Sequence, residues 1–174
     1  MAYLNFGGSG TMLYKFINYI KAKPIDDINL IGFINLEDDG IYEFTPMLTF
    51  VYFQYGEEYI EFESINQYSK LKVSFVQSLP SIRHKYDTVE DFFPAKSSIS
   101  DIVLIHPSAI NNIVSSITFY NLEESDDSIT CDSILFRLKN EQVIFLDPTF
   151  ISGINVGGIE QYEFWRFNNS EEIN

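Results

Sequence analysis

The sequence has very few of the residues that build covalent or metal-bound scaffolds. Its 174 residues include one cysteine, Cys131, and two histidines, His84 and His106. One thiol cannot form an internal disulfide, and disulfide-rich scaffolds are typical of small secreted domains. A structural zinc site usually needs four closely spaced Cys or His ligands, which these three residues do not supply. We therefore expect neither disulfides nor zinc, and a reducing, cytoplasmic location.

Positive charge is missing from a long part of the chain. From residue 24 to residue 69 there is no Lys, Arg or His, and the whole protein has 25 acidic residues, 11 basic residues and a formal net charge of -14. Such a chain repels the phosphates of nucleic acids and the headgroups of anionic lipids. We therefore expect no direct binding to nucleic acid or to a membrane surface.

Long hydrophobic runs are also absent. The most apolar segment, residues 12–20, is interrupted by Lys15 and Asn18, whereas crossing a bilayer takes roughly 20 apolar residues. The N-terminus has no basic stretch before an apolar one, so we read no signal peptide in it. These features predict a soluble, cytoplasmic protein.

The sequence does contain enough apolar material for a folded core. Hydrophobic residues make up 45% of the chain and aromatic residues 16%, well above the content of disordered acidic chains. A chain of this length fits one domain, and no repeat, linker or low-complexity tract divides it. We expect a single domain over residues 1–174, with a frayed polar tail from residue 168.

Hydrophobic spacing predicts one helix followed mainly by strands. Residues 11–22 carry apolar side chains at helical spacing, with Thr11 as a cap and Pro24 beyond the end. From Asn29 onward, short runs rich in Ile, Phe, Tyr and Val alternate with turn residues, which is typical of strands. Residues 47–54 are apolar on both faces, which predicts a central strand.

A charge pattern predicts a hairpin within residues 59–76. Apolar residues alternate with Glu in its first half and with Lys in its second half, so each strand has an apolar face and a charged face. One antiparallel register places Glu63 opposite Lys70 and Glu61 opposite Lys72. We expect this register.

The second half of the chain is predicted from the same signals. We expect a strand at 99–105, a helix at 108–117, a hairpin of 129–138 and 142–146 that turns at Asn140-Glu141, a flexible loop at 153–158 and a strand at 160–167. The order of helix, strands, helix and strands indicates an α+β domain. In such a domain a largely antiparallel sheet carries one or two helices on one face.

Motifs for catalysis and cofactor binding are incomplete. The glycine-rich residues 7–10 precede the first helix, where backbone amides can bind phosphate, but they lack the lysine of a P-loop and the third glycine of a dinucleotide-binding turn. Cys131, His106 and an acid such as Asp101 would form a thiol triad, yet Cys131 lies in a predicted strand, like an ordinary core residue. The acidic clusters do not follow EF-hand spacing. We expect no enzyme activity, cofactor or metal, although a pair of carboxylates for glycoside hydrolysis is defined in space and stays open.

The ten carboxylates between residues 24 and 69 are the strongest functional signal. The fields of like charges add, which raises the association rate of a positively charged partner. Acids in turns explain only part of this pattern, because exposed sheet faces usually intersperse Lys with Glu. Tyrosine is enriched at interface hot spots, and carboxylates can bind arginine through two hydrogen bonds. The predicted partner-binding residues are Asp38, Asp39, Tyr55, Glu57, Glu58, Tyr59, Glu61 and Glu63.

Two acidic clusters, Glu57-Glu58-Tyr59-Ile60-Glu61 and Asn121-Leu122-Glu123-Glu124-Ser125-Asp126-Asp127, stand in a compact acidic chain. In this general character the whole chain resembles bacterial immunity proteins, the small cytosolic partners that neutralise polymorphic or contact-dependent toxins. The resemblance implies tight, stoichiometric binding to a cognate toxin. Such a toxin is often a basic nuclease whose active site is occluded by acidic groups.

We therefore expect a non-enzymatic acidic protein that binds a basic protein partner, with a cognate toxin as the leading example. Two other classes stay open. A phage or structural assembly protein would self-associate through an exposed apolar patch. An enzyme acting on a small molecule would need a pocket with convergent polar groups. DNA mimicry is a variant of the first reading and would require regularly spaced acids on one elongated face.

Overall fold

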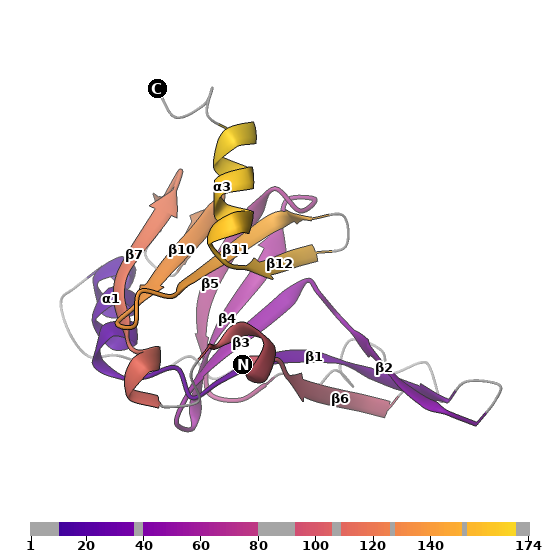
Figure 1. Cartoon of the computed structure of the whole chain (residues 1–174). Helices are drawn as coiled ribbons and strands as arrows, with labels where there is room; N and C mark the ends of the chain where they lie inside the picture. Colours follow the sequence, from indigo (N-terminus) through magenta and orange to yellow (C-terminus); the bar gives the residue numbers. More distant parts are fainter. Residues whose placement is uncertain are drawn as a thin grey trace.

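The strands of this protein form two antiparallel sheets, which pack face to face (Figure 1). The computed structural model describes residues 11–36, 40–79, 93–105, 109–125, 128–150 and 153–169. Helices accompany the two sheets, which confirms the predicted α+β class. None of the helices among the described residues combines the length and the apolar character needed to span a membrane.

The larger sheet has the strand order β2-β1-β3-β4-β5-β9-β8. β6 also pairs with β1, along the edge opposite to β2, because residues 32–34 of β1 pair with both strands. The outer half of β1 therefore projects with β2 and β6 as a three-stranded arm (Figure 1). The strands are β1 (Asp27–Leu36), β2 (Tyr42–Pro46), β3 (Phe50–Tyr55), β4 (Glu58–Ile65), β5 (Lys70–Val76), β6 (Phe93–Ser98), β8 (Glu123–Glu124) and β9 (Ile129–Cys131).

The smaller sheet has the strand order β12-β11-β10-β7. Its strands are β7 (Val114–Tyr120), β10 (Ser133–Leu138), β11 (Val143–Phe150) and β12 (Gly153–Gly157). The helices are α1 (Met12–Ala22), α2 (Ser100–Val103) and α3 (Ile159–Asn168), and a short 3-10 helix, η2, covers Ala109–Asn112. In Figure 1, α1 lies beside β7, and α3 lies against β11 and β12.

The main core lies between the two sheets. Alternate residues of β10, including Phe136, point toward the larger sheet and are fully buried. The Phe136 ring centroid is 5.3 Å from that of Phe53 in β3 and 5.8 Å from that of Phe62 in β4. Because burying such a side chain contributes about 1.5–3 kcal/mol, these contacts hold the sheets together.

The outer face of the smaller sheet is covered by α3. Trp165 of α3 packs against Phe145 of β11 and Tyr120 of β7, at centroid distances of 5.5 and 4.7 Å. Tyr162, one turn earlier, shares a hydrogen bond of 2.9 Å between its hydroxyl and that of Tyr120. β10 and β11 are therefore apolar on both faces, because each face has a covering layer.

α1 begins and ends where the sequence predicts. The Thr11 hydroxyl accepts a hydrogen bond from the Tyr14 amide at 3.3 Å, as an N-cap does. Phe16 and Ile20 are fully buried, and Phe16 packs on Phe75 of β5 and on β7. The apolar stripe of α1 thus closes one side of the space between the sheets.

Gly153 joins the two sheets at a point where only glycine fits. Its φ of 135° is unfavourable for other residues, and a Cβ atom there would collide with the Leu48 carbonyl. The neighbouring Ile154 amide donates a hydrogen bond of 2.6 Å to that carbonyl. This contact connects β12 to the segment just before β3.

Two strand predictions in the larger sheet are confirmed, and one register is wrong. β3 is buried on both faces, and the predicted hairpin is formed by β4 and β5. Glu63 lies opposite Lys72 and Glu61 lies opposite Ser74, two residues away from the predicted register. A shift of two residues leaves every side chain on its face, so the alternation cannot decide between the registers. The four-residue turn after Ile65 decides it.

In the second half of the chain the hairpin of β10 and β11 is confirmed, but β9 belongs to the other sheet. The predicted strand at 99–105 is replaced by α2, and the predicted helix at 108–117 by η2 and β7. β7 is rich in β-branched residues, which favour strands. The predicted loop at 153–158 is mostly β12, and the predicted strand at 160–167 is α3. Tyr162 and Trp165 are three residues apart, so a helix places both on the smaller sheet.

Candidate partner-binding site at the turn between β3 and β4

The structure divides the acidic segment among separate places. The pairing of β1 with β3 brings Asp26 beside the turn that carries Glu57 and Glu58. Glu43 pairs with Asn35 on the arm, which is eight residues along β1 from Asp27, or about 26 Å at 3.3 Å per residue. The predicted residues Asp38 and Asp39, together with Glu37, lie outside the described residues. The described acids therefore do not form one continuous surface.

Two predicted partner-binding residues are buried, which corrects the expectation that they are exposed. Glu61 is 6% exposed, and its carboxylate accepts a hydrogen bond of 2.9 Å from the Tyr52 hydroxyl. Tyr55 is 1% exposed and belongs to the main core. Glu63 and Tyr59 are half-buried on β4. The outer face of the larger sheet has its own apolar cluster around Tyr52, so Glu61 does not face open solvent.

Asp27 has a structural role next to this region. One of its carboxylate oxygens accepts hydrogen bonds from the hydroxyls of Ser98 and Ser100, at 2.5 and 2.6 Å. The same oxygen accepts a bond of 2.8 Å from the Ile28 amide. These bonds tie α2 to the start of β1, so Asp27 is not available to a partner in the way that Asp26 is.

The predicted acids Glu57 and Glu58 lie at one end of the larger sheet, in a group of residues that we call the turn site. Gly56 has a φ of 67°, which lets the chain turn tightly between β3 and β4. The Gly56 amide donates a hydrogen bond of 2.5 Å to the Asp26 carboxylate, which fixes this acid beside the turn. The turn site consists of Tyr19, Lys23, Asp26, Tyr55, Glu57 and Glu58.

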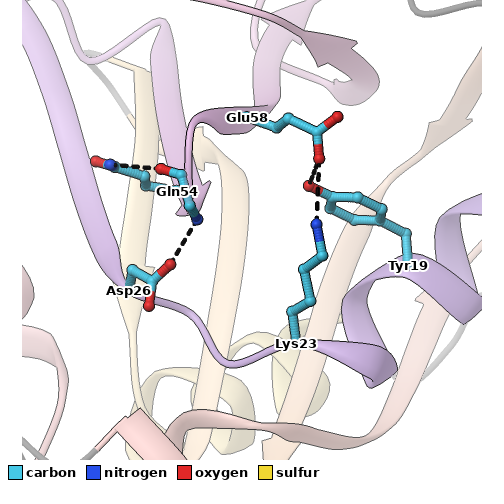
Figure 2. A network of polar contacts seen from close by, with 6 residues as sticks. Tyr19, Lys23, Asp26, Gln54 and Glu58 are labelled. Atoms are coloured by element: carbon cyan, nitrogen blue, oxygen red, sulfur yellow. Dashed lines mark hydrogen bonds and ion pairs between the residues drawn. The ribbon is translucent and has the colours of Figure 1, made fainter.

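Glu58 is the centre of the turn site (Figure 2). Its Oε2 atom accepts a hydrogen bond from the Tyr19 hydroxyl and lies 3.3 Å from the Lys23 ammonium. The ammonium also lies 4.8 Å from the centroid of the Tyr19 ring, within the range of a cation–π interaction. The site thus already holds one positive charge between a carboxylate and an aromatic face.

Tyr19 is held in place by other aromatic rings. Its ring makes T-shaped contacts with the rings of Tyr55 and Phe75, at centroid distances of 5.5 and 5.3 Å. Burial raises the pKa of Tyr19, and the hydrogen bond and charge of Glu58 raise it further, so the phenol stays neutral. Burial also raises the pKa of Tyr55, whose buried hydroxyl has no hydrogen-bond partner within the described part of the chain.

The charge of the turn site is negative and largely accessible. Asp26 and Glu57 are exposed, Glu58 has a side-chain exposure of 29%, and Lys23 has one of 50%. The turn site thus contains three carboxylates and only one ammonium, that of Lys23. This arrangement can bind a cationic side chain, since it offers acceptors and an aromatic face.

The thiol and metal chemistry that the sequence analysis considered gains no support from the described residues. Cys131 is buried, and this burial raises the pKa of its thiol, which is the opposite of what an activated nucleophile needs. Asp101 is exposed on α2, whereas His106 and glycines 7–10 lie outside the described residues. No cluster of three or more potential metal ligands occurs among the residues that the structure describes.

Three residues of the turn site, Tyr19, Lys23 and Asp26, were not among the predicted partner-binding residues. Tyr19 and Lys23 are four residues apart at the end of α1, and this spacing places both on one face of the helix. That spacing was the available signal for their contact. Their pairing with Glu58 joins positions 39 and 35 residues apart, which no local pattern encodes.

Comparison with known proteins gives no relative: no family model, curated protein or solved structure matches this chain. The turn site and the charge of the chain are therefore the basis on which we infer a function.

Proposed function

We propose that this chain is a non-enzymatic binding protein whose turn site docks a basic protein partner. The resemblance to immunity proteins suggests a cationic toxin as that partner, neutralised by direct binding. One observation carries the proposal. Three carboxylates, Asp26, Glu57 and Glu58, lie at or beside the turn between β3 and β4, and one of them is hydrogen-bonded to a fixed tyrosine, on a chain whose net charge is -14.

The net charge of the whole protein and the local charges of the turn site have different effects on binding. The net charge steers a basic partner toward the protein from a distance and raises the association rate. At contact, Glu58 and the ring of Tyr19 are partly buried and well positioned, so they contribute to how long the complex lasts. The proposal thus predicts an on-rate that depends on salt and on the charge of the turn site, and an off-rate that depends on Glu58 and Tyr19.

The test first examines the adjacent reading frame for a large gene with a variable C-terminal toxin domain. That domain, produced in an inactive form, then serves as the binding partner. Stopped-flow association is measured as the ionic strength rises from 0.1 to 1 M, which shortens the Debye length from about 10 to about 3 Å. The variant Glu57→Lys/Glu58→Lys reverses charge at the turn site. The control variant Glu160→Lys/Glu163→Lys makes the same change of charge on the exposed side of α3.

We expect salt to slow association on the order of tenfold or more, and the turn-site variant to slow it well beyond the control. An on-rate that neither salt nor the turn-site variant changes would refute the docking role. Sedimentation of the purified chain addresses the assembly alternative, because a self-assembling protein forms oligomers alone. The proposed binding protein sediments as a monomer and forms a complex only with its partner.

A further inference from the structure

We propose that Glu58 and the face of Tyr19 form a receptor for one arginine side chain, and that Lys23 occupies this receptor in the free protein. The inference rests on the proposed function, since the arginine would belong to the basic partner. It names the chemical group that the turn site recognises, and it makes Lys23 an internal competitor.

The ammonium of Lys23 shows that the receptor accepts a cation. It contacts the two features that an incoming guanidinium would use, because it lies 3.3 Å from Glu58 Oε2 and 4.8 Å from the Tyr19 ring centroid. Figure 2 shows this ammonium beside the Glu58 carboxylate and the Tyr19 ring. A positive charge in this place is thus observed in the folded chain itself.

The receptor is ordered before any partner arrives. Tyr55 and Phe75 fix the ring of Tyr19, and the Tyr19 hydroxyl orients the Glu58 carboxylate. Glu58 Oε1 accepts no hydrogen bond from the described residues, since both Tyr19 and Lys23 use Oε2. A guanidinium can therefore donate to both carboxylate oxygens, in the two-bond geometry that lysine cannot form.

The polar groups around the receptor are not fully used in the free chain. The Tyr55 hydroxyl is buried without a hydrogen-bond partner in the described part of the chain, and the Tyr55 ring packs against the Tyr19 ring. Buried polar groups are nearly always paired, so the Tyr55 hydroxyl is a hydrogen-bonding group that the described part of the free chain leaves unused. Asp26, fixed by the Gly56 amide, adds a second carboxylate at the same end of the sheet.

Lys23 is held weakly enough to be displaced. It follows the last residue of α1 and its side chain is half exposed, and an exposed ion pair of this kind contributes only about 0–1 kcal/mol. A guanidinium has five donors in a planar fork, stacks on aromatic rings and is less strongly hydrated than an ammonium. Arginine should therefore replace Lys23 on Glu58.

The test uses N-acetyl-arginine amide as a probe, titrated into the isolated chain at low ionic strength and followed by NMR. N-acetyl-lysine amide and neutral N-acetyl-citrulline amide are the comparison probes. Lys23→Met removes the internal competitor. Lys21→Met makes the same change of charge at an exposed position in the last turn of α1 and is the matched control.

We expect the arginine probe to shift the signals of Tyr19 and Glu58 and to bind more tightly than the lysine probe, with the citrulline probe weakest. Lys23→Met should raise affinity for the arginine probe up to about fivefold, while Lys21→Met raises it less than about twofold. Glu58→Gln, checked for an unchanged fold by its NMR spectrum, should abolish the shifts at Tyr19.

The receptor proposal would be overturned if Lys23→Met and Lys21→Met changed the affinity for the arginine probe equally. It would also be overturned if the arginine and citrulline probes bound equally well. These results are independent of the docking test, because the probe needs no partner. If the probe binds as expected but charge reversal leaves the toxin's on-rate unchanged, the receptor stands and the proposed docking function fails. If docking responds to charge reversal but the probe does not compete with Lys23, only the receptor is refuted.

Discussion

Replacing Phe136 by alanine tests whether one shared core holds the two sheets together. Phe136 is fully buried in β10 and contacts Phe53 and Phe62 from the opposite sheet. The change removes up to about 3 kcal/mol of apolar transfer free energy. It also removes two ring contacts and leaves a cavity. Together these losses should lower the free energy of unfolding by about 3–5 kcal/mol.

Urea unfolding measures this loss with two probes. Circular dichroism follows the strands, while the fluorescence of Trp165, the protein's single tryptophan, follows the outer layer of the smaller sheet. The two transitions should coincide, because one core serves both sheets. Phe164→Ala is the control, since Phe164 is 65% exposed on α3 and its loss should cost less than about 0.5 kcal/mol. A loss below about 1.5 kcal/mol for Phe136→Ala, or two separate transitions, would contradict a shared core.

Two further predictions concern the helix cap and the buried tyrosines. Thr11→Ala should lower the free energy of unfolding by about 1 kcal/mol in urea titrations, whereas Thr11→Ser, which keeps the hydroxyl, should have little effect. Burial raises the pKa of Tyr52 and Tyr55, and unfolded tyrosines ionise near pH 10. The folded state therefore keeps these protons longer, and the free energy of unfolding should fall as the pH rises above about 10. Constant stability between pH 9 and pH 11.5, measured by urea unfolding, would disprove this dependence.

The elements that the sequence predicts well are those in which several local signals agree. In α1, the cap at Thr11, the apolar spacing and Pro24 all point to the same helix. For α3 the local signals did not agree, because its apolar and polar residues also alternate as they do in a strand. Only the position of Phe145, against which Tyr162 and Trp165 pack, distinguishes the two possibilities. That position is set by the fold and cannot be read from neighbouring residues.

The candidate site was predictable only in its local part. Glu57 lies in the turn with Gly56 and Glu58 begins β4 directly after it, and acids at turns are usually accessible. The burial of Glu61 was not predictable, since it depends on Tyr52 of the adjacent strand. The contact of Lys23 with Glu58 depends on where α1 packs against the sheet. The sequence thus identified Glu57 and Glu58 as accessible acids but could not identify the residues that surround them.

β1 belongs to two parts of the molecule that differ in how well they are protected. Its first residues, Asp27 to Asn29, pair with β3 in the covered part of the sheet, whereas residues 32–36 pair with β2, which has no buried residue. The arm can therefore open while the pairs with β3 stay closed. Backbone amides of one strand should then exchange with deuterium on two timescales, fast toward the tip of the arm and slow near Ile28.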